Sequence, residues 1–279
     1  MCRGRSSDAG KVARVVSGAR RLGALLMHAA CLCLPLSGAV AAPEEIVVFT
    51  DEFTPPSEVG YELHLNWTRR GRMTPAYAGE QPPGRVLRLM PEVVWGLSPG
   101  WNLGLHLPMS RDTVRDITSV DGLKVRLQNL NVRASGSGST WFYGANYEIN
   151  LFHRRVSELP AQVEVRGIIG WRNEDWMAAL NPVLSRGLNA RAGADNHTDL
   201  DVFGKVMRTL GKDLSVGVEH YSSLGPLHRP EFGGRSGQIT YGVVEFPLPG
   251  GFDVHLGVGH GWTASSDKRV FKMLLGLPL

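Results

Sequence analysis

The chain has 279 residues, with 30 Lys and Arg, 26 Asp and Glu, and three cysteines. Residues 1–41 hold six of the bases, one acid and all of the cysteines, which leaves 24 bases against 25 acids and no cysteine after them. That balance excludes the strongly basic surface of a nucleic-acid-binding protein, so we expect no nucleic-acid partner. It also excludes a small secreted fold that depends on disulfides.

Residues 1–41 follow the order of a secretory signal peptide. Arg3, Arg5 and four further bases precede an apolar run over 22–36, and 38–41 read GAVA, the small residues of a cleavage site. We expect cleavage near Ala41. No later segment offers the ~20 continuous apolar residues of a transmembrane helix, so this chain could span a bilayer only with strands.

From Val59 onward, apolar and polar residues alternate with a period of two, which predicts β-strands. In 101–110, WNLGLHLPMS, Trp101 and every second residue to Met109 are large and apolar. The phase is ambiguous at Glu245 and Phe246, where a bulge could reset it. The pattern covers twelve segments: 59–67, 87–97, 101–109, 123–132, 141–151, 163–171, 176–184, 200–206, 214–220, 239–246, 252–258 and 270–279.

The connections between these segments are of two kinds, tight turns and long loops. Tight turns on one rim and long loops on the other are typical of outer-membrane barrels, whereas a soluble sandwich has no reason to sort its loops in this way. The sequence therefore predicts an all-β fold, a 12-stranded antiparallel up-and-down transmembrane β-barrel. Turn residues occur at 98–100, 173–175, 211–213 and 249–251, and the long loops include 69–84, 111–122, 186–198 and 222–237.

The tryptophans support a membrane location. If the first strand rises from the periplasmic side, every Trp falls at a strand end and none in mid-strand. Indole rings favour the edge of a bilayer, where the ring is in an apolar surrounding and the N–H is solvated. The expected aromatic girdle consists of Trp95, Trp101, Trp141, Trp171 and Trp176 at the periplasmic rim, and Trp67 and Trp262 at the extracellular rim.

We expect three parts in the chain: a signal peptide over 1–41, a periplasmic N-terminal segment over 42–57 and a β-barrel domain over 58–279. The location is the outer membrane of a Gram-negative cell, and the partners are outer-membrane lipid, the barrel assembly machinery and small solutes. Residues 43–50, PEEIVVFT, resemble the TonB box of energised transporters. Those proteins carry a plug domain and a larger barrel, so we interpret this segment as a short periplasmic tail.

Four segments carry a resemblance to a known group: WNLGLHLPMSRD, WFYGANYEINL, LSVGVEHYSSLGPL and HLGVGHGWTASSDKRVFKMLLGL. They resemble the proteobacterial outer-membrane barrels of the MetA-pathway-of-phenol-degradation family and related transporter barrels. The resemblance implies a small barrel that passes small molecules. Such barrels usually end in Phe, as part of the signal read by the assembly machinery, whereas this chain ends in Leu279.

Strand parity assigns the polar side chains to the lumen. We expect a narrow channel for passive passage of small solutes, and the alternative is a closed structural or binding barrel in which these charges pair. Twelve strands lie between the filled barrels of about eight and the open channels of sixteen or more. No cofactor, catalytic residue or metal ligand is assigned. The expected lumen-lining residues are Glu62, His64, Arg88, Glu92, His106, Lys124, Arg126, Glu148, Glu164, Arg166, Lys205, Glu219, Asp253, His255 and Lys272.

A second alternative is a lipid-modifying outer-membrane enzyme. Such an enzyme needs a nucleophile beside a histidine base near the lipid-facing rim. His220, Ser222 and Ser223 form the one neighbourhood of this kind that we would test. Another cluster, from Asp195 to Asp201, has oxygen-rich spacing that could hold Ca²⁺, but it lacks the glycine and terminal glutamate of an EF-hand loop, so we interpret it as a solvated acidic loop.

Overall fold

Fourteen β-strands and one 3₁₀ turn, Gly233–Arg235, form the regular part of the computed structural model, which describes residues 45–135, 138–188 and 196–277. The expected signal peptide, 1–41, lies outside the described residues. The strands are β1 (Val59–Arg70), β2 (Val86–Ser98), β3 (Trp101–His106), β4 (Met109–Asp112), β5 (Ile117–Val120), β6 (Gly122–Ala134), β7 (Thr140–Phe152), β8 (Ala161–Arg172), β9 (Trp176–Gly187), β10 (Thr198–Leu210), β11 (Leu214–Pro226), β12 (Gly237–Leu248), β13 (Phe252–Gly261) and β14 (Arg269–Leu277).

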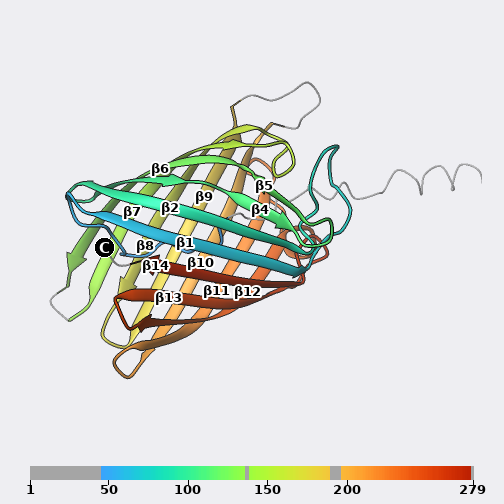
Figure 1. Ribbon diagram of the computed structural model, residues 1–279. Helices are drawn as coiled ribbons and strands as arrows, with labels where there is room; N and C mark the ends of the chain where they lie inside the picture. The colour runs from blue at the N-terminus through green and yellow to red at the C-terminus, as the bar shows by residue number, and fades with distance from the viewer. Residues whose placement is uncertain (1–44, 136–137, 189–195, 278–279) are drawn as a thin grey trace, which may run out of the picture. The chain divides into compact units, whose positions relative to one another are not determined.

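The sheet closes on itself. Each strand pairs antiparallel with its neighbours, and β1 pairs with both β2 and β14, so that Leu65 lies between Leu89 and Met273. Figure 1 shows the strands running side by side at a common tilt. Closure pairs the strands all the way around the barrel wall, as an apolar surrounding demands of backbone donors and acceptors, and of the described strands only β5, at the long-loop rim, pairs on one side, with β4.

Two of the twelve barrel strands are each interrupted once. β3 and β4 both pair with β2, and the break between them falls at Leu107 and Pro108, because proline has no N–H to donate to a ladder. β5 lies within 111–122, which was predicted to be a long loop, and only Asp121 separates it from β6, so that fourteen labels fall on twelve barrel strands. The predicted fold, a 12-stranded antiparallel barrel, is therefore confirmed.

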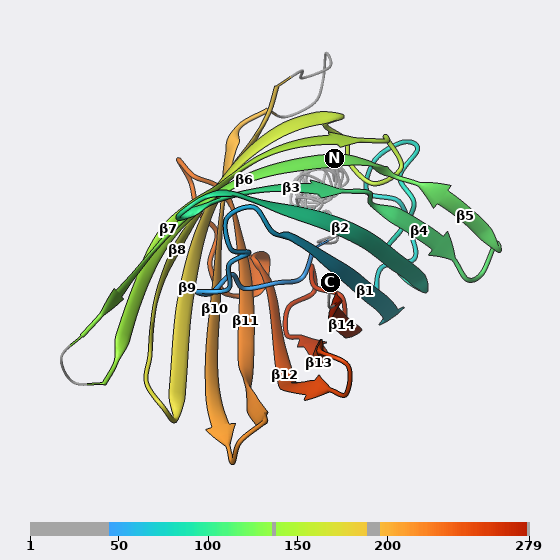
Figure 2. The same cartoon turned by 60° about the vertical axis from the view of Figure 1, so that its left-hand side comes forward.

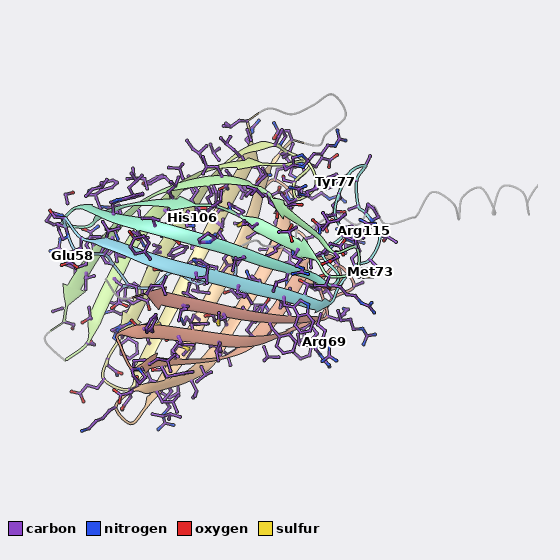
Figure 3. The ribbon with its side chains drawn as sticks, in the orientation of Figure 1. Glu58, Arg69, Met73, Tyr77, His106 and Arg115 are labelled. Atoms are coloured by element: carbon purple, nitrogen blue, oxygen red, sulfur yellow. The ribbon has the colours of Figure 1, made fainter. Side chains whose placement is uncertain are left out.

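The two rims differ as the loop lengths predict. Figure 3 places Glu58 at one end of the barrel, and Arg69, Met73, Tyr77 and Arg115 at the other, where the long connections gather. Three of the tight turns contain glycines in the left-handed region, which only glycine adopts without strain: Gly100 (φ 78°), Gly211 (φ 75°) and Gly250 (φ 91°).

The outward face of the strands is apolar over much of its height, which is the composition of a lipid-facing band. Its members point away from the lumen on successive strands, in the alternation that the sequence predicts. They include Leu105, Leu123, Val125, Tyr147, Ile149, Val165, Ile169, Leu180, Val206, Val218 and Val258, all more than a third exposed. Among the described residues, no helix has the length and hydropathy needed to cross a bilayer.

Candidate functional site in the barrel lumen

The N-terminal segment lies inside the barrel. We expected residues 42–57 to form a short periplasmic tail, but the described residues of this segment run from the short-turn rim into the lumen, beneath β2 in Figure 2. Asp51 pairs with Arg172 at that rim, at 2.5 Å. The Phe49 backbone donates to Asn181 Oδ1 at 2.7 Å, and the Asn181 amide donates back to the Phe49 carbonyl at 3.1 Å. We call residues 45–56 the N-terminal finger.

Glu45, at the inner end of the finger, forms ion pairs with the lumen wall. Its carboxylate accepts from Lys124 and lies 3.4 Å from the Arg126 guanidinium. Burial alone would raise the pKa of Glu45, but the charges of Lys124 and Arg166 outweigh it and hold this pKa well below its ordinary value. Glu45 is therefore an anion that the positive lumen wall binds.

The finger backbone is bound as well. The Lys272 ammonium donates to the Ile46 carbonyl at 3.1 Å, and Arg166 donates to the Val47 carbonyl at 3.3 Å. The Phe49 ring lies between two guanidinium groups, with Arg126 4.6 Å and Arg166 5.0 Å from its centroid. Several lumen cations that the sequence assigns to a solute pathway thus contact the chain's own N-terminal segment.

The finger also meets an apolar half of the lumen wall. Ile46 and Val48 are buried in a cluster of inward-facing side chains from β6 to β14. The alternation rule had assigned the apolar side of every strand to lipid, and it missed these residues because the buried finger supplies a second apolar environment. The cluster includes Leu130, Phe142, Ile168, Met177, Val183, Phe203, Met207, Tyr221, Tyr241, Val243 and Val270.

The first charged network lies on the wall formed by β1 to β7. Glu92 is its centre, because it accepts from Arg126 and lies 3.1 Å from His64 Nε2 and 3.2 Å from His106 Nδ1. All four side chains are buried. Three further predicted residues extend the network: Glu62 lies 3.6 Å from His64, and Glu148 lies 2.6 Å from Lys124.

The second network lies across the lumen on β10 to β14. Glu219 accepts from Lys272 and lies 3.5 Å from Lys205 and 3.4 Å from His255. Glu245, which was absent from the expected set because its phase was ambiguous, faces inward and lies 2.7 Å from His255 Nδ1. Glu245 alternates in phase with Tyr241 and Val243. An assignment of those two apolar side chains to the lumen would therefore have predicted that Glu245 faces the lumen as well.

The remaining predicted lumen residues are less tightly connected. Glu164 lies 2.8 Å from Arg166 on the same strand. Arg88 is buried on β2, whereas Asp253 is exposed beside the short turn before β13. The structure thus groups most of the predicted residues into two networks, and Arg88, Asp253 and the Glu164–Arg166 pair lie outside both.

One part of the first network has the donor set of a metal site. Glu45, His64 and Glu92 offer ligand atoms within 4.8 Å of one another, and all three are buried. Arg126 already contacts both carboxylates, so a cation of the chain occupies the place where a metal ion would balance the charge. The geometry therefore favours an ion-pair network over a metal centre.

The loop between β1 and β2 covers the opposite end of the lumen. Arg72 and Glu80 form a two-bond pair at 2.6 and 2.7 Å, and Glu80 is buried. The Gln81 N–H donates to the Arg155 carbonyl at 2.7 Å, and Ser110 donates to the Gln81 side chain at 3.2 Å. These contacts tie the loop to β4 and to the connection between β7 and β8.

Little space remains between finger and wall. A cavity bordered by Ile46, His64, His255 and Lys272 has a volume of about 10 Å³, which is near the minimum for one water molecule. A larger pocket, of about 420 Å³, lies at the long-loop rim and is bordered by Arg69, Arg70, Gly71, Met73, Arg85 and Arg269. The finger and the wall are therefore closely packed around Ile46.

The tryptophans lie on the outer face near strand ends. Trp67, Trp101, Trp141, Trp176 and Trp262 are all more than a third exposed. Two of the predicted girdle residues are direct cross-strand neighbours, since Trp141 pairs with Trp171. Trp95 and Trp171 are partly covered.

The outer face of β11 and β12 carries the polar cluster that the sequence singled out. His220 Nε2 lies 3.1 Å from Ser222 Oγ and 2.8 Å from Gln238 Oε1, and His220 Nδ1 lies 2.8 Å from Thr240 Oγ1. Ser223 does not join this cluster, because it pairs in register with Asp201 and alternates to the other face. The partners Gln238 and Thr240 come from the next strand, so their role could be found only from the register.

Comparisons with known proteins show the fold. No family model and no curated protein matches the chain. The NanC porin matches with a TM-score of 0.52 and 9% identity, over 78% of this chain and 100% of its own. An outer membrane channel from Pseudomonas putida F1 matches with a TM-score of 0.52 and 11% identity, over 83% of this chain and 98% of its own. The chain is therefore similar in fold to outer-membrane barrels, whereas the narrower family named above stays a prediction.

Proposed function

We propose that this protein is an outer-membrane channel for small solutes that its own N-terminal finger closes. The observation that carries the proposal is the position of residues 45–56 inside a barrel whose outer face is apolar. The fold shared with the NanC porin and the Pseudomonas channel supports a membrane-spanning barrel that can conduct. Export through a signal peptide and insertion by the assembly machinery belong to the same proposal.

Closure by the finger is reversible in this proposal because nothing covalent holds it. Its contacts are ion pairs, hydrogen bonds and apolar packing, and the finger is the chain end once a signal peptide has been removed. A terminal segment can leave the lumen without breaking any strand pairing. Solute passage then requires the finger to move out, after which paired charges of both signs line the bore.

Planar-bilayer recording of the refolded protein, started at residue 42, tests this function. We expect rare or small current steps from that protein and frequent, larger steps from a variant lacking residues 42–56. Glu58→Ala is the matched control, because Glu58 is exposed outside the lumen at the same rim, and it should leave the currents unchanged. A heat-dependent gel shift establishes that each variant is folded.

Two results would contradict the proposal in different ways. A folded finger-deletion variant without conductance would exclude a channel. Equal conductance with and without the finger would retain the channel and exclude the finger as its closing element. In the conducting variant, Arg126→Gln with Arg166→Gln should shift the reversal potential toward cations, because two positive charges leave the wall.

A further inference from the structure

Two neighbouring residues of β11 present polar groups to the outside of the barrel. Glu219 and Tyr221 are buried and point into the lumen, so the alternation of the strand directs His220 and Ser222 outward. Both are partly exposed on a face that is otherwise apolar over much of the barrel. Polar groups on a lipid-facing surface are energetically costly. The ion pairs of the lumen do not explain why His220 and Ser222 are polar, because these two side chains face outward.

The hydrogen bonds around His220 bring its Nε2 atom close to the Ser222 hydroxyl. The Trp262 indole N–H can only donate, and it donates to Thr240 Oγ1 at 2.9 Å. Thr240 Oγ1 lies 2.8 Å from His220 Nδ1 and holds that side of the ring. His220 Nε2 lies 3.1 Å from Ser222 Oγ, so a histidine without a proton on Nε2 could take the serine proton.

Gln238 fixes the remaining hydrogen bonds of the pair. Its Oε1 atom can only accept: it lies 2.8 Å from His220 Nε2, and Ser222 Oγ donates to it at 2.7 Å. Its Nε2 group donates to Ser236 Oγ at 2.7 Å, which fixes the orientation of the amide. The contact at 2.8 Å requires a proton on His220 Nε2, so His220 acts as a base after that proton has left, and it donates to Gln238 Oε1 again once it has taken the serine proton.

The wall beside this cluster is free of side chains. Gly204 is the cross-strand partner of His220 on β10, and a Cβ built there meets no atom closer than 3.8 Å. Gly242 lies on β12 opposite Val218, and a Cβ there has no neighbour within 4 Å. The outer surface is therefore low on both sides of β11, next to exposed Leu180 and Val218, and an acyl chain could lie against it.

We propose that Ser222 and His220 are the nucleophile and general base of a hydrolase site on the outer wall, with acyl esters of membrane lipids as substrates. Ser222 Oγ attacks the ester carbonyl while His220 Nε2 takes its proton. That proton passes to the leaving alcohol as the C–O bond of the ester breaks. Water, activated by the same nitrogen, then hydrolyses the acyl-serine and releases the fatty acid. This activity is independent of solute passage through the lumen.

Covalent labelling tests the nucleophile. A fluorophosphonate probe should label the refolded, gel-shifted protein at Ser222, as mapped by peptide mass spectrometry. Ser222→Ala should abolish labelling, and His220→Ala should lower its rate by on the order of 100-fold or more. Ser223→Ala, the matched neighbouring serine outside the cluster, should label as the unmodified protein does. An unlabelled folded protein, or equal labelling after His220→Ala, overturns the proposal.

Lipid hydrolysis identifies the source of the ester. Fatty acid release is measured by mass spectrometry from phosphatidylethanolamine in mixed micelles and, separately, from purified lipid A. Release from the first lipid assigns a glycerophospholipid, and release from the second assigns an acylated glycolipid. In either case the release must disappear with Ser222→Ala. Release from neither, or release that persists in that variant, overturns a membrane-lipid ester as substrate.

Two variants test the positioning of the ester and of the base. Gly204→Leu should raise KM for long-chain esters several-fold more than KM for p-nitrophenyl acetate, because only a long chain needs the open wall. Thr240→Val should slow fluorophosphonate labelling about tenfold, and Thr240→Ser should restore it, because the hydroxyl orients His220. Equal effects of Gly204→Leu on both esters would exclude the acyl-chain surface.

Discussion

Two polar clusters on opposite sides of the same strand differ in how their groups are satisfied. Inside, Glu219 is fully buried and is matched by Lys272, Lys205 and His255. Outside, His220 and Ser222 are partly exposed and hydrogen-bonded to amide and hydroxyl groups of β12. The inner charges hold the finger and the wall together. The contacts of the outer pair lie within β11 and β12, which are already joined by their backbone pairing.

Burial and pairing distinguish a structural polar group from a reactive one. A buried ion pair is strongly destabilising when one partner is removed, because the other is left unpaired in a dry place. Replacing a partly exposed serine or histidine lowers the free energy of unfolding only a little. Substitution in the inner cluster is therefore expected to change the stability of the barrel, and substitution in the outer cluster is expected to change the chemistry.

The largest expected difference is in stability. Arg126→Met removes the partner of Glu92 and Glu45 and should lower the free energy of unfolding by about 3–5 kcal/mol. His220→Leu, which places an apolar group on the lipid face, should change it by less than about 1 kcal/mol. Urea unfolding in lipid vesicles, followed by tryptophan fluorescence, measures both. Equal losses in the two variants would refute the distinction.

A second effect concerns pH and the finger. Because the folded-state pKa of Glu45 is held below the ordinary 4.5, its contribution to finger binding is present above pH 4.5 and is lost as the pH falls through the lowered value. Conductance of the protein started at residue 42 should therefore stay low at neutral and mildly acidic pH and rise only in stronger acid. Glu45→Gln should remove the part of this rise that comes from the finger.

Conductance recordings across the pH range, with the finger-deletion variant as control, test whether conductance rises only in strong acid. A rise that begins near neutral pH, or one of equal size in the deletion variant, would mean that another group controls closure.

The smallest expected effect is at the edge of the outer cluster. Trp262→Phe removes the N–H that occupies Thr240 Oγ1 and should slow probe labelling of Ser222 by about two- to tenfold, the worth of one hydrogen bond. Barrel stability should not change measurably, because Trp262 is 66% exposed. A rate equal to that of the unmodified protein would show that Thr240 orients His220 without help.

Much of the fold was predictable from the sequence because a membrane barrel repeats one local rule. Strict alternation fixes which side chain of each strand faces which side, and turn residues fix where strands end. The predicted segment 101–109 became β3 and β4, with a break only where Pro108 cannot donate. The membrane requires closure of the sheet, so strand number and loop lengths were enough to give the architecture.

The candidate sites were only partly predictable. Lumen charges such as Glu92 and Arg126 follow from parity, but their pairing depends on strand register. His220 and Ser222 stand two residues apart on one strand, so their proximity is visible in the sequence. Gln238 and Thr240 are not, because they lie on another strand and reach His220 only through the cross-strand pairing.

The sequence by itself determined the barrel, its two unlike rims, its apolar outer band and the inward direction of most charges, because all of these follow from a period of two and from turn chemistry. Only the tertiary structure decided that residues 45–56 fill the lumen, that Tyr241, Val243 and Glu245 face inward, and which charges pair. The physical reason is that these features depend on contacts between segments far apart in the chain. Lys124 and Lys272 bind neighbouring residues of one finger, Glu45 and Ile46, only because closure of the sheet brings β6 and β14 around the same interior.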